Sequence, residues 1–404
     1  MKIVFFTDVY LEVAGGITTS IRGQKTELEK LGHEVIIFCP GHEKTPTEPN
    51  VYKVPTMKHA NFGDAPTSKR PKVVKKWILE NHPEIKEADV FHVHYEASCS
   101  IAGAQLAREL NIPLVQTMHG REDMAIDMNI PTAIKYPIAR ILDTAHSICL
   151  PHATKIKKDN YLAPNHSRAR MWELMVNHAN FADAVITPSQ HFADKLKHYG
   201  VTKPQFIVSN GIPDATVKKI AKSRTWDGES PLQIIWNSRV SREKRILPFL
   251  EALDPEMNFH LDIYGDGNDL TNAKKCAIIK GIDKKITFYG FTPHETILKN
   301  LKKYHLSVMA SYGFDNQSMI LLEAVAAGLP VLYCDPDMSE VVPKGGAMLT
   351  KTEQPPAIRD ALSDILSHPT KIAKMSKIMY QNRQAVAEST QVKELLKVYQ
   401  SVIK

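Results

Sequence analysis

Cysteine is scarce and scattered in this sequence. The 404 residues contain five cysteines, at positions 39, 99, 149, 276 and 334, with no CxxC pair and no clustering with histidine. A dispersed, odd-numbered set of cysteines argues against a disulfide framework and against a structural zinc site. We therefore expect reduced cysteines and a cytoplasmic protein.

Long apolar runs are missing as well. No stretch approaches the roughly 20 apolar residues that a membrane-spanning helix requires. The opening "MKIVFFTDVYLEV" has only a short apolar run with acids soon after it, which predicts a first β-strand and not a signal peptide. The net charge of +7 is mild and favours anionic partners such as nucleotides or an acidic membrane face. A nucleic-acid partner is the weakest alternative, because the charge is mild and the sequence shows no aromatic stacking platform.

Short apolar runs alternate with helical patterns through the whole chain. Examples in the first half are "KIVFFT", "DVFHVHY" and "DAVITPS", and examples in the second half are "QIIWNSRV", "FHLDIYGDG" and "LPVLYCD". This alternation predicts βαβ units and an α/β fold with two doubly wound, Rossmann-like domains. We place these domains at residues 1–200 and 201–385, and expect a final helix at 386–404 to pack back on the first domain. Ligands of such sheets bind beyond the carboxyl ends of the strands, so two facing domains predict a site in a central cleft.

A glycine pair follows the first predicted strand. Gly15 and Gly16 let the backbone approach a ligand closely, and the helix that opens after them could present free N–H groups to a phosphate. The spacing is not GxGxxG. The pattern fits ligand contact, and it fits a plain strand–helix turn equally well.

Four cations lie in the segment "SRVSREKR", after the first predicted strand of the second domain. Arg239 and Lys244 are placed to clamp a pyrophosphate and to offset the charge of a leaving group. The pattern alone does not distinguish this pair from Arg242 and Arg245, and solvated basic turns are common. A further glycine turn, "YGDG" with Gly265, follows the next strand and is weak evidence by itself.

His119 ends a predicted strand of the first domain, in "TMHGRED". A histidine at this position can bind a sugar hydroxyl or move a proton, although a single histidine is more often structural. Glu122 and Asp123 follow it as further candidates, or as ordinary acids at a helix start. In "FHVHYE", His92 and His94 share one strand face and Glu96 follows them, but this spacing is not specific for a metal site and the third ligand is only a guess, so we predict no metal site.

The stretch "DNQSMILLEAVAAGLPV" places the acids Asp315 and Glu323 eight residues apart, the second at a predicted helix start. It is either a surface loop running into a core helix or a pocket for a ligand with many hydroxyls. Two other stretches, "SKRPKVVKKWI" and "HATKIKKDNYLAPNHSRARMW", combine basic residues with Trp77 and Trp172. This combination suits docking on an anionic bilayer, and it also suits a solvated helix face.

Taken in order, these motifs resemble the family 4 glycosyltransferases of the GT-B fold over nearly the whole chain. The resemblance rests on Gly15-Gly16, "TMHG", "VITPS", "VSNGIP", "SRVSREK", "YGDG", "ITFYGF" and "DNQSMILLEAVAAGLPV". It implies that Glu323 binds the ribose of a nucleotide sugar, that Asp315 holds hydroxyls of the donor sugar, and that His119 lies near the transferred sugar. It also makes Arg239 and Lys244 the pyrophosphate-binding pair. The remaining predicted substrate-binding residues are Gly15, Gly16, Gly265, Phe291, Asn316, Gln317, Ser318 and Met319.

The chain departs from the family pattern at three positions. Asp315 stands where the family usually has glutamate, and Ser318 stands where it often has glycine. Gln317 replaces a frequent phenylalanine, which is similar to the subgroup that glycosylates diacylglycerol at the inner membrane face. These departures leave the choice of donor sugar open.

The resulting prediction is a retaining, metal-independent transferase without a cofactor. We expect it to move a hexose from UDP-glucose to a membrane lipid such as diacylglycerol, with His119, Arg239 and Lys244 as catalytic residues. It would be cytoplasmic and peripheral on an anionic inner membrane face. The alternatives are a soluble or polymeric sugar acceptor, a UDP-sugar epimerase, and a catalytically inactive scaffold that binds a sugar nucleotide. The sequence leaves the oligomeric state open.

Overall fold

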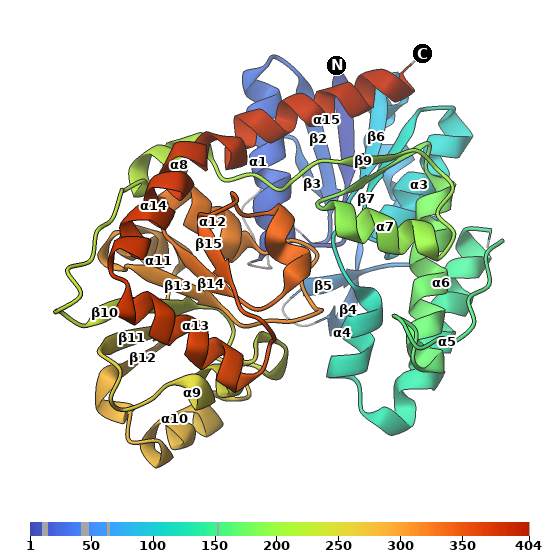
Figure 1. The fold of residues 1–404 in the computed structure, drawn as a ribbon. Helices are drawn as coiled ribbons and strands as arrows, with labels where there is room; N and C mark the ends of the chain where they lie inside the picture. Colours follow the sequence, from blue (N-terminus) through green and yellow to red (C-terminus); the bar gives the residue numbers. More distant parts are fainter. Residues whose placement is uncertain (10–14, 42–47, 63–64, 152, 404) are drawn as a thin grey trace. The chain divides into compact units, whose positions relative to one another are not determined.

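The computed structural model describes residues 1–9, 15–41, 48–62, 65–151 and 153–403. The chain divides into two compact units, of which the first contains Met1–Ser209 together with Gln391–Lys404 and the second contains Asn210–Thr390. The division along the chain thus falls between Ser209 and Asn210, where the sequence predicted 200 and 201. Figure 1 shows a sheet in each unit with helices packed around it.

The first unit is built on a parallel sheet with the order β3-β2-β1-β6-β7-β8-β9. Its central strands are short runs of buried Val, Ile and Phe, as expected when helices cover both faces of a parallel sheet. The strands are β1 (Lys2–Phe6), β2 (Glu34–Cys39), β3 (Val51–Lys53), β6 (Val90–Val93), β7 (Leu114–Thr117), β8 (Ala184–Thr187) and β9 (Gln205–Ile207). A separate antiparallel pair is formed by β4 (Thr56–Phe62) and β5 (Ala65–Ser68).

The helices of the first unit include the long neighbours α5 and α6. The set is α1 (Gly16–Lys30), α2 (Pro71–Asn81), η1 (Pro83–Glu87), α3 (Ser98–Leu110), α4 (Glu122–Asn129), α5 (Thr132–Cys149), α6 (His166–Phe181) and α7 (Gln190–His198). A small apolar cluster of Ile126, Ala139, Met171 and Leu174 holds α4, α5 and α6 together.

The second unit repeats the design with the strand order β12-β11-β10-β13-β14-β15. Its strands are β10 (Leu232–Asn237), β11 (Phe259–Tyr264), β12 (Ile286–Gly290), β13 (Leu306–Met309), β14 (Val331–Tyr333) and β15 (Ala347–Leu349). Its α-helices are α8 (Asp214–Ile220), α9 (Ile246–Ala252), α10 (Leu270–Ile279), α11 (His294–Asn300), α12 (Met319–Ala327), α13 (Pro355–Ser367) and α14 (Thr370–Asn382). Short 3-10 turns are η2 (Arg242–Lys244), η3 (Asp283–Lys285), η4 (Leu301–Lys303), η5 (Pro336–Glu340) and η6 (Arg383–Val386).

The last helix, α15 (Glu388–Val402), brings the end of the chain back to the first unit. One side of it buries Val392, Leu395, Val398 and Tyr399 in the core that contains β1 and β2. The Tyr399 hydroxyl lies 2.7 Å from Nδ1 of the buried His92 on β6. Apolar burial and this buried hydrogen bond anchor α15 on the first unit.

Candidate active site

The loops after β10, β11, β12 and β13 gather at the carboxyl edge of the second sheet. Neighbouring parallel strands end at the same edge, so these loops lie side by side. Backbone hydrogen bonds join them: the Val240 N–H donates to the Asp266 carbonyl at 3.0 Å, and the Gly265 N–H donates to the Gly290 carbonyl at 2.9 Å. The sequence-predicted donor residues of the second unit are all carried on or next to these loops.

Lys244 and Asp315 form an ion pair in this set of loops. Lys244 Nζ donates to Asp315 Oδ1 at 2.7 Å, and both side chains are largely buried. The same ammonium lies 4.9 Å from the centre of the Phe314 ring, which adds a cation–π contact. The second carboxylate oxygen, Oδ2, is buried without a hydrogen-bond partner among the described residues. A buried acceptor of this kind is costly unless a ligand donates to it.

The structure separates the four cations that the sequence left equivalent. Arg239 is exposed and pairs with Glu243 at 3.1 Å, and Ser241 Oγ donates to the same carboxylate at 2.6 Å. Arg245 adopts a left-handed backbone (φ 61°) and donates through Nη2 to the Glu353 carbonyl at 2.6 Å. Arg242 is exposed. Lys244 alone of the four therefore pairs with the predicted sugar-binding acid.

Glu323 is a buried acid in an otherwise apolar helix. The sequence placed it at a helix start, but α12 begins at Met319, so Glu323 lies one turn inside. Its Oε1 lies 2.7 Å from His294 Nε2, and its Oε2 accepts from Asn237 Nδ2 at 3.4 Å. The hydrogen bond to Glu323 raises the pKa of His294, against the opposing effect of burial. The pair is placed to hold a hydroxyl-rich ligand at this edge.

The segment 316–319 leads into α12. Gln317 Oε1 accepts from the Asn210 backbone N–H at 2.8 Å and from Asn210 Nδ2 at 3.0 Å, so this amide anchors the start of the second unit. Asn316 and Ser318 are buried, and Met319 is half-buried. Ser318 occupies the N-cap of α12 without a side-chain capping bond. The Leu321 and Leu322 N–H groups donate to the Ser318 carbonyl at 3.1 and 3.3 Å, and the N–H groups of Met319 and Ile320 precede this turn, where an outside acceptor could reach them.

Two predicted binding residues of this edge have different surroundings. A Cβ atom at Gly265 (φ 146°) would come within 2.0 Å of the Ser238 carbonyl oxygen, so the glycine is required by backbone packing. Phe291, directly after β12, is instead 80% exposed. Its ring is available to a planar ligand group.

A second polar cluster lies at the carboxyl edge of the first sheet. His94 Nδ1 and His119 Nε2, following β6 and β7, are 3.2 Å apart, and burial lowers the pKa of His119 to about 4. Asp8, following β1, accepts from the Cys99 N–H at the start of α3 at 2.8 Å. Buried atoms His94 Nε2 and Glu96 Oε1 have no hydrogen-bond partner among the described residues.

Glu122 and Asp123 play different parts at the start of α4. Asp123 is fully buried and is held by Arg121 at 2.7 Å and by Arg168 at 2.6 Å, which fixes α4 against α6. Burial raises the pKa of Glu122 to about 7, where it interacts with Tyr95 and Glu96. Glu122 therefore belongs with the His94–His119 cluster, and Asp123 is structural.

Gly15 and Gly16 open α1 at the same edge of the first sheet. Both are exposed, and the space around Gly15 is open, since an added Cβ would meet nothing within 4 Å. Part of the preceding loop, residues 10–14, lies outside the described residues. The first turn of α1 carries no acidic side chain and no side-chain cap, and its Thr19 N–H donates to the Gly15 carbonyl at 3.0 Å.

The strand histidines have protein partners. His92 uses both ring nitrogens, with Tyr399 and with Thr117 Oγ1, each at 2.7 Å. Within the described ranges, no group of three or more His, Cys, Asp or Glu residues is arranged to hold a metal ion. His92 thus has no nitrogen left for a metal in this arrangement.

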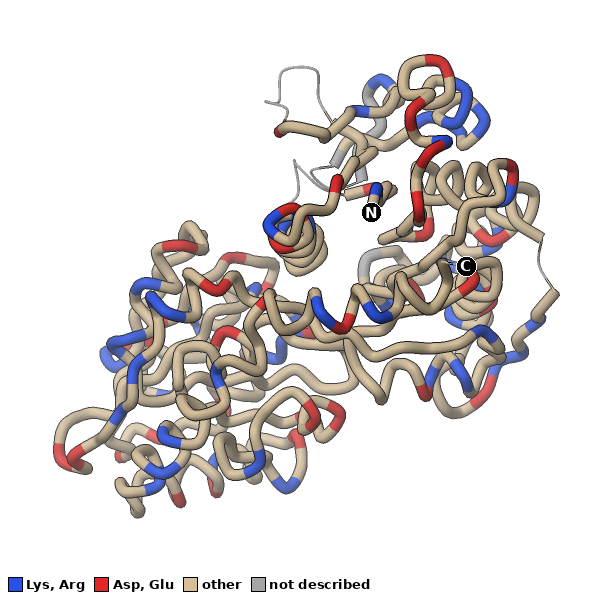
Figure 2. The backbone as a smooth tube through the Cα atoms, turned by 90° about the horizontal axis from the view of Figure 1, so that it is seen from above, with Lys and Arg blue, Asp and Glu red and all other residues tan. Residues whose placement is uncertain are grey.

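The two basic stretches carry their tryptophans in different surroundings. Trp172 is fully buried, and its neighbours Arg168 and Arg170 pair with Asp123 and Asp143. Trp77 is only half-buried, and Lys75 beside it pairs with Glu109. Figure 2 shows basic and acidic positions interspersed along both units. Trp172 lies on the buried side of α6 and faces neither solvent nor a membrane surface, so this tryptophan supports neither of the two interpretations left open for its stretch.

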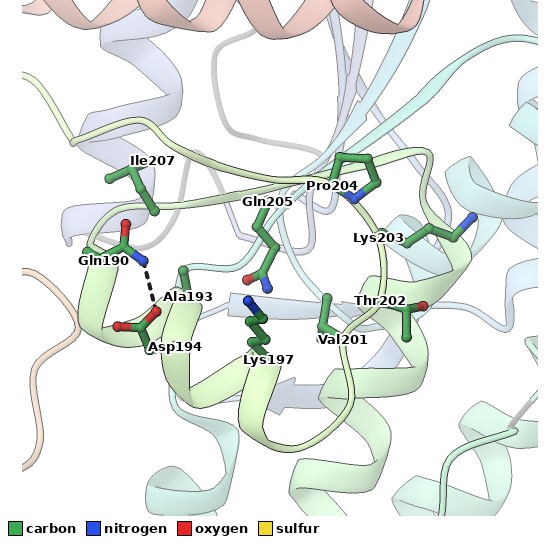
Figure 3. A pocket seen from close by; sticks show the side chains of 10 residues that line it. All are labelled: Gln190, Ala193, Asp194, Lys197, Val201, Thr202, Lys203, Pro204, Gln205 and Ile207. Carbon is green, nitrogen blue, oxygen red and sulfur yellow. Dashed lines mark hydrogen bonds between the residues drawn. The ribbon is translucent and has the colours of Figure 1, made fainter.

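A shallow depression lies elsewhere in the first unit, between α7 and the edge strand β9. It encloses about 710 Å³ and is lined by Gln190, Asp194, Lys197 and Gln205 among others. Figure 3 shows the Gln190–Asp194 hydrogen bond on one of its sides. None of its lining residues is among the predicted site residues.

Comparison with protein families assigns both parts of the chain. The family model described as Glycosyltransferase Family 4 matches residues 14–216, and the model described as Glycosyl transferases group 1 matches residues 217–384. This chain is a family 4 glycosyltransferase of the GT-B fold. The prediction of family and fold from the sequence motifs is confirmed.

Relatives of this glycosyltransferase include two enzymes with the same name. Alpha-monoglucosyldiacylglycerol synthase of Streptococcus pneumoniae is 29% identical over 365 residues, 82% of this chain and 70% of the relative. The enzyme of that name from Acholeplasma laidlawii is 24% identical over 381 residues, 88% of this chain and 86% of the relative. The glycosyltransferase thus resembles diacylglycerol glucosyltransferases over most of its length.

Solved structures share the fold of the glycosyltransferase. Anabaena Alr3699/HepE in complex with UDP superimposes with a TM-score of 0.70 at 15% identity, covering 99% of this chain and 100% of that one. Sucrose-phosphate synthase from Thermosynechococcus elongatus gives a TM-score of 0.70 at 16% identity, covering 99% and 98%. At these identities the likeness concerns the fold.

Sequence reasoning missed His294, Asn237 and Glu243, which contact the predicted donor-binding residues Glu323 and Arg239. His294 follows β12 in "FTPHE" and Asn237 ends β10, so the carboxyl-end rule that singled out His119 would have found both. Glu243 lies four residues after Arg239, which is the spacing of an ion pair on a helical turn.

Proposed function

We propose that this glycosyltransferase moves glucose from UDP-glucose to diacylglycerol in a membrane, with retention of anomeric configuration. The observation that supports a nucleotide sugar as the donor is the buried Lys244–Asp315 pair, in which the second carboxylate oxygen, Asp315 Oδ2, has no hydrogen-bond partner among the described residues. A buried pair that keeps one acceptor unsatisfied suits a ligand that brings hydroxyl donors and an anionic group together.

The donor contacts follow from the second unit. We propose that Glu323 accepts the ribose hydroxyls, in competition with His294, and that Asp315 Oδ2 accepts a sugar hydroxyl. Lys244, the exposed Arg239 and the first N–H groups of α12 would stabilise the departing diphosphate. The exposed Phe291 ring would stack on the base. We propose that these protein charges act without a metal ion or another cofactor.

The relatives support the acceptor and the stereochemistry. Two relatives are named alpha-monoglucosyldiacylglycerol synthase. UDP-glucose carries an α-linked glucose, so an α-linked product means retention of configuration. In a front-face transfer the acceptor oxygen attacks from the side that the diphosphate leaves, and the protein contributes orientation and charge stabilisation.

We propose that the lipid acceptor binds at the polar cluster on the carboxyl edge of the first sheet. Glu122 and Glu96 lie close together with their pKa values raised by burial, and Oε1 of Glu96 is buried without a partner among the described residues. Such carboxyl groups could hold the free hydroxyl of diacylglycerol. His119, neutral because burial lowers its pKa to about 4, would accept or donate one hydrogen bond to the transferred sugar.

One product assay tests the proposal. The full chain is incubated with UDP-glucose and diacylglycerol in mixed detergent micelles, and both UDP release and the lipid product are measured. We expect a glucosyl lipid whose anomeric proton has the small coupling constant of an α-linkage. A β-linked product would contradict retention, and transfer only to soluble sugars would contradict the lipid acceptor.

The same assay addresses the other functions. Isomerised UDP-sugar formed without acceptor would show an epimerase. Tight UDP binding without turnover of any of several nucleotide sugars would show an inactive scaffold and contradict the enzymatic proposal.

A further inference from the structure

Helix α5 of the first unit has a buried side and an apolar exposed side. Its buried side consists of Ala139, Asp143 and His146, with Ala139 in the cluster that joins α4, α5 and α6. Large apolar side chains on the opposite side are exposed instead: Ile134 47%, Ile141 65%, Leu142 44% and Ile148 81%. Four exposed apolar side chains on one helix are unusual for a surface that stays in water.

These exposed residues form one stripe together with Ile138, which is half-buried against the cluster that joins α4, α5 and α6. Ile134, Ile138, Ile141, Ala145 and Ile148 follow the spacing i, i+4, i+7, i+11 and i+14, which lines one face of a helix. Leu142 widens this stripe at one side. We call these six residues the α5 stripe. Because Ala139, Asp143 and His146 face the other way, the stripe is not the core side of the helix.

The charged residues of α5 outside its buried side are both basic. All residues of α5 are described, and its single acid, Asp143, is buried and pairs with Arg170 at 3.2 Å. On a helical projection Lys135 and Arg140 lie on opposite flanks of the stripe, although Lys135 also pairs with Asp127 at 3.0 Å. Farther along the chain, Lys157 and Lys158 are exposed and precede Asp159. An apolar stripe flanked by cations is complementary to an anionic bilayer surface.

We propose that the α5 stripe docks this glycosyltransferase on an anionic lipid bilayer, with the helix lying in the membrane interface. The inference rests on the proposed transfer to a membrane lipid, and it names the surface that brings the enzyme to it. Helix α4 begins three residues after His119 and leads directly into α5. The docking helix is thus connected in sequence to the acceptor end of the site.

Other exposed apolar residues provide a comparison on the same chain. Ile278 (65%) and Ile279 (85%) at the end of α10 match Ile141 and Ile148 in exposure. They also lie near cations, at Lys275 and Lys280. These two residues are adjacent and lie within a single helical turn, however, so they form only a small apolar patch. The α5 stripe instead extends over about four turns of helix.

The test compares two double variants of the full chain. Ile141→Glu with Ile148→Glu places two acids in the α5 stripe, and Ile278→Glu with Ile279→Glu is the matched control. Each protein is sedimented with vesicles of phosphatidylcholine alone and of phosphatidylcholine with phosphatidylglycerol. Because all four positions are exposed, both variants should fold, which circular dichroism and thermal unfolding would check.

We expect the wild type and the α10 variant to bind the anionic vesicles, and the α5 variant to bind at least tenfold more weakly. Binding should fall with added salt and with phosphatidylcholine alone. Unchanged binding of the α5 variant would overturn the proposal, as would a loss confined to the α10 variant or a wild type that binds neither vesicle. A wild-type dimer that the α5 variant converts to monomer, without any change in vesicle binding, would assign the stripe to a contact between copies and also overturn it.

A second readout separates this inference from the proposed function. Transfer to diacylglycerol dispersed in detergent does not require bilayer docking, so the α5 variant should keep wild-type activity there and lose it on vesicles. Loss of activity in both systems would contradict a docking role for α5. Absence of transfer by the wild type in detergent would count against the proposed function, while the vesicle sedimentation would still test the stripe.

Discussion

At the scale of single residues, Lys244 differs from the three arginines of its loop by contacting Asp315. Replacing Lys244 by methionine keeps most of the apolar stem and removes the charge next to the proposed diphosphate. We expect kcat to fall by about 10²–10³-fold, the usual effect of losing one group that stabilises charge in the transition state. Steady-state kinetics with UDP-glucose would measure it. Arg242→Met, in the same loop but exposed, is the control and should leave kcat within about twofold; equal losses in both variants would contradict the assignment.

The pKa of His294 reports on the ribose site that we propose around Glu323. Its pKa lies above the usual 6.5 because Glu323 accepts its ring N–H, so the charged pair is fully formed below pH 6.5 and is lost as pH rises through the pKa of the folded state. We expect Glu323→Gln to lower the pKa of His294, measured by NMR titration of the histidine ring. Uridine, which brings a ribose without phosphate charge, should lower it too.

His305 in the same unit is the control for that titration, since its pKa is lowered mainly by burial. It should not respond to Glu323→Gln or to uridine. If uridine binds and the pKa of His294 stays the same, the ribose does not compete with His294 for Glu323, and this part of the proposal is wrong.

At the scale of the elements, the turn after β11 requires a glycine because the backbone of a neighbouring loop packs closely against it. Gly265 combines a φ of 146° with a Cβ position only 2.0 Å from the Ser238 carbonyl oxygen. Gly265→Ala should therefore lower the free energy of unfolding of the second unit by about 2–4 kcal/mol, from backbone strain and a steric clash together. Chemical denaturation followed by tryptophan fluorescence, with Trp226 and Trp236 in this unit, would measure the change.

Gly313→Ala is the matched control for Gly265. Its φ of 65° is also left-handed, but an added Cβ there meets nothing within 4 Å. The control should cost only about 1 kcal/mol, the strain of the backbone alone. Equal losses at the two positions would mean that the loop after β10 moves away to accommodate the side chain.

The elements themselves were predictable because their signal is local. Runs such as "KIVFF" and "LQIIWN" are buried strands that need no distant partner to be recognised, and the carboxyl-end rule then indicated His119 and Lys244, whereas Asp315 was indicated by the family resemblance. Local patterns could not decide those questions whose answer depends on three-dimensional packing. Nothing local to "SRARMW" shows that Trp172 faces inward, because α6 is covered on that side by residues distant in sequence such as Phe192.

The α5 stripe was not predicted for a related reason. A mostly apolar helix of 18 residues fits a buried helix as well as an interfacial one, and only the contacts of Ala139, Asp143 and His146 show which side is covered. Among the described residues, no helix is both long enough and apolar enough to cross a membrane.

At the scale of the whole molecule, the chain contributes to the first unit twice. Residues 391–404 return after the second unit is complete, and Leu395 on α15 is almost fully buried in the core of β1 and β2. Leu395→Ala should destabilise the first unit by about 2–5 kcal/mol, from lost apolar burial and the cavity that remains. Leu362→Ala on α13, buried to the same extent in the second unit, should act there instead.

The readout for these two variants has to resolve the units, since a two-domain chain need not unfold in one step. Hydrogen exchange read by mass spectrometry does this. Leu395→Ala should lower the protection of peptides from β1, β2 and β6 and leave β10, β11 and β13 unchanged, and Leu362→Ala should give the reverse. Uniform loss of protection in both variants would mean that the units unfold as one, in which case α15 stabilises the molecule as a whole and not the first sheet in particular.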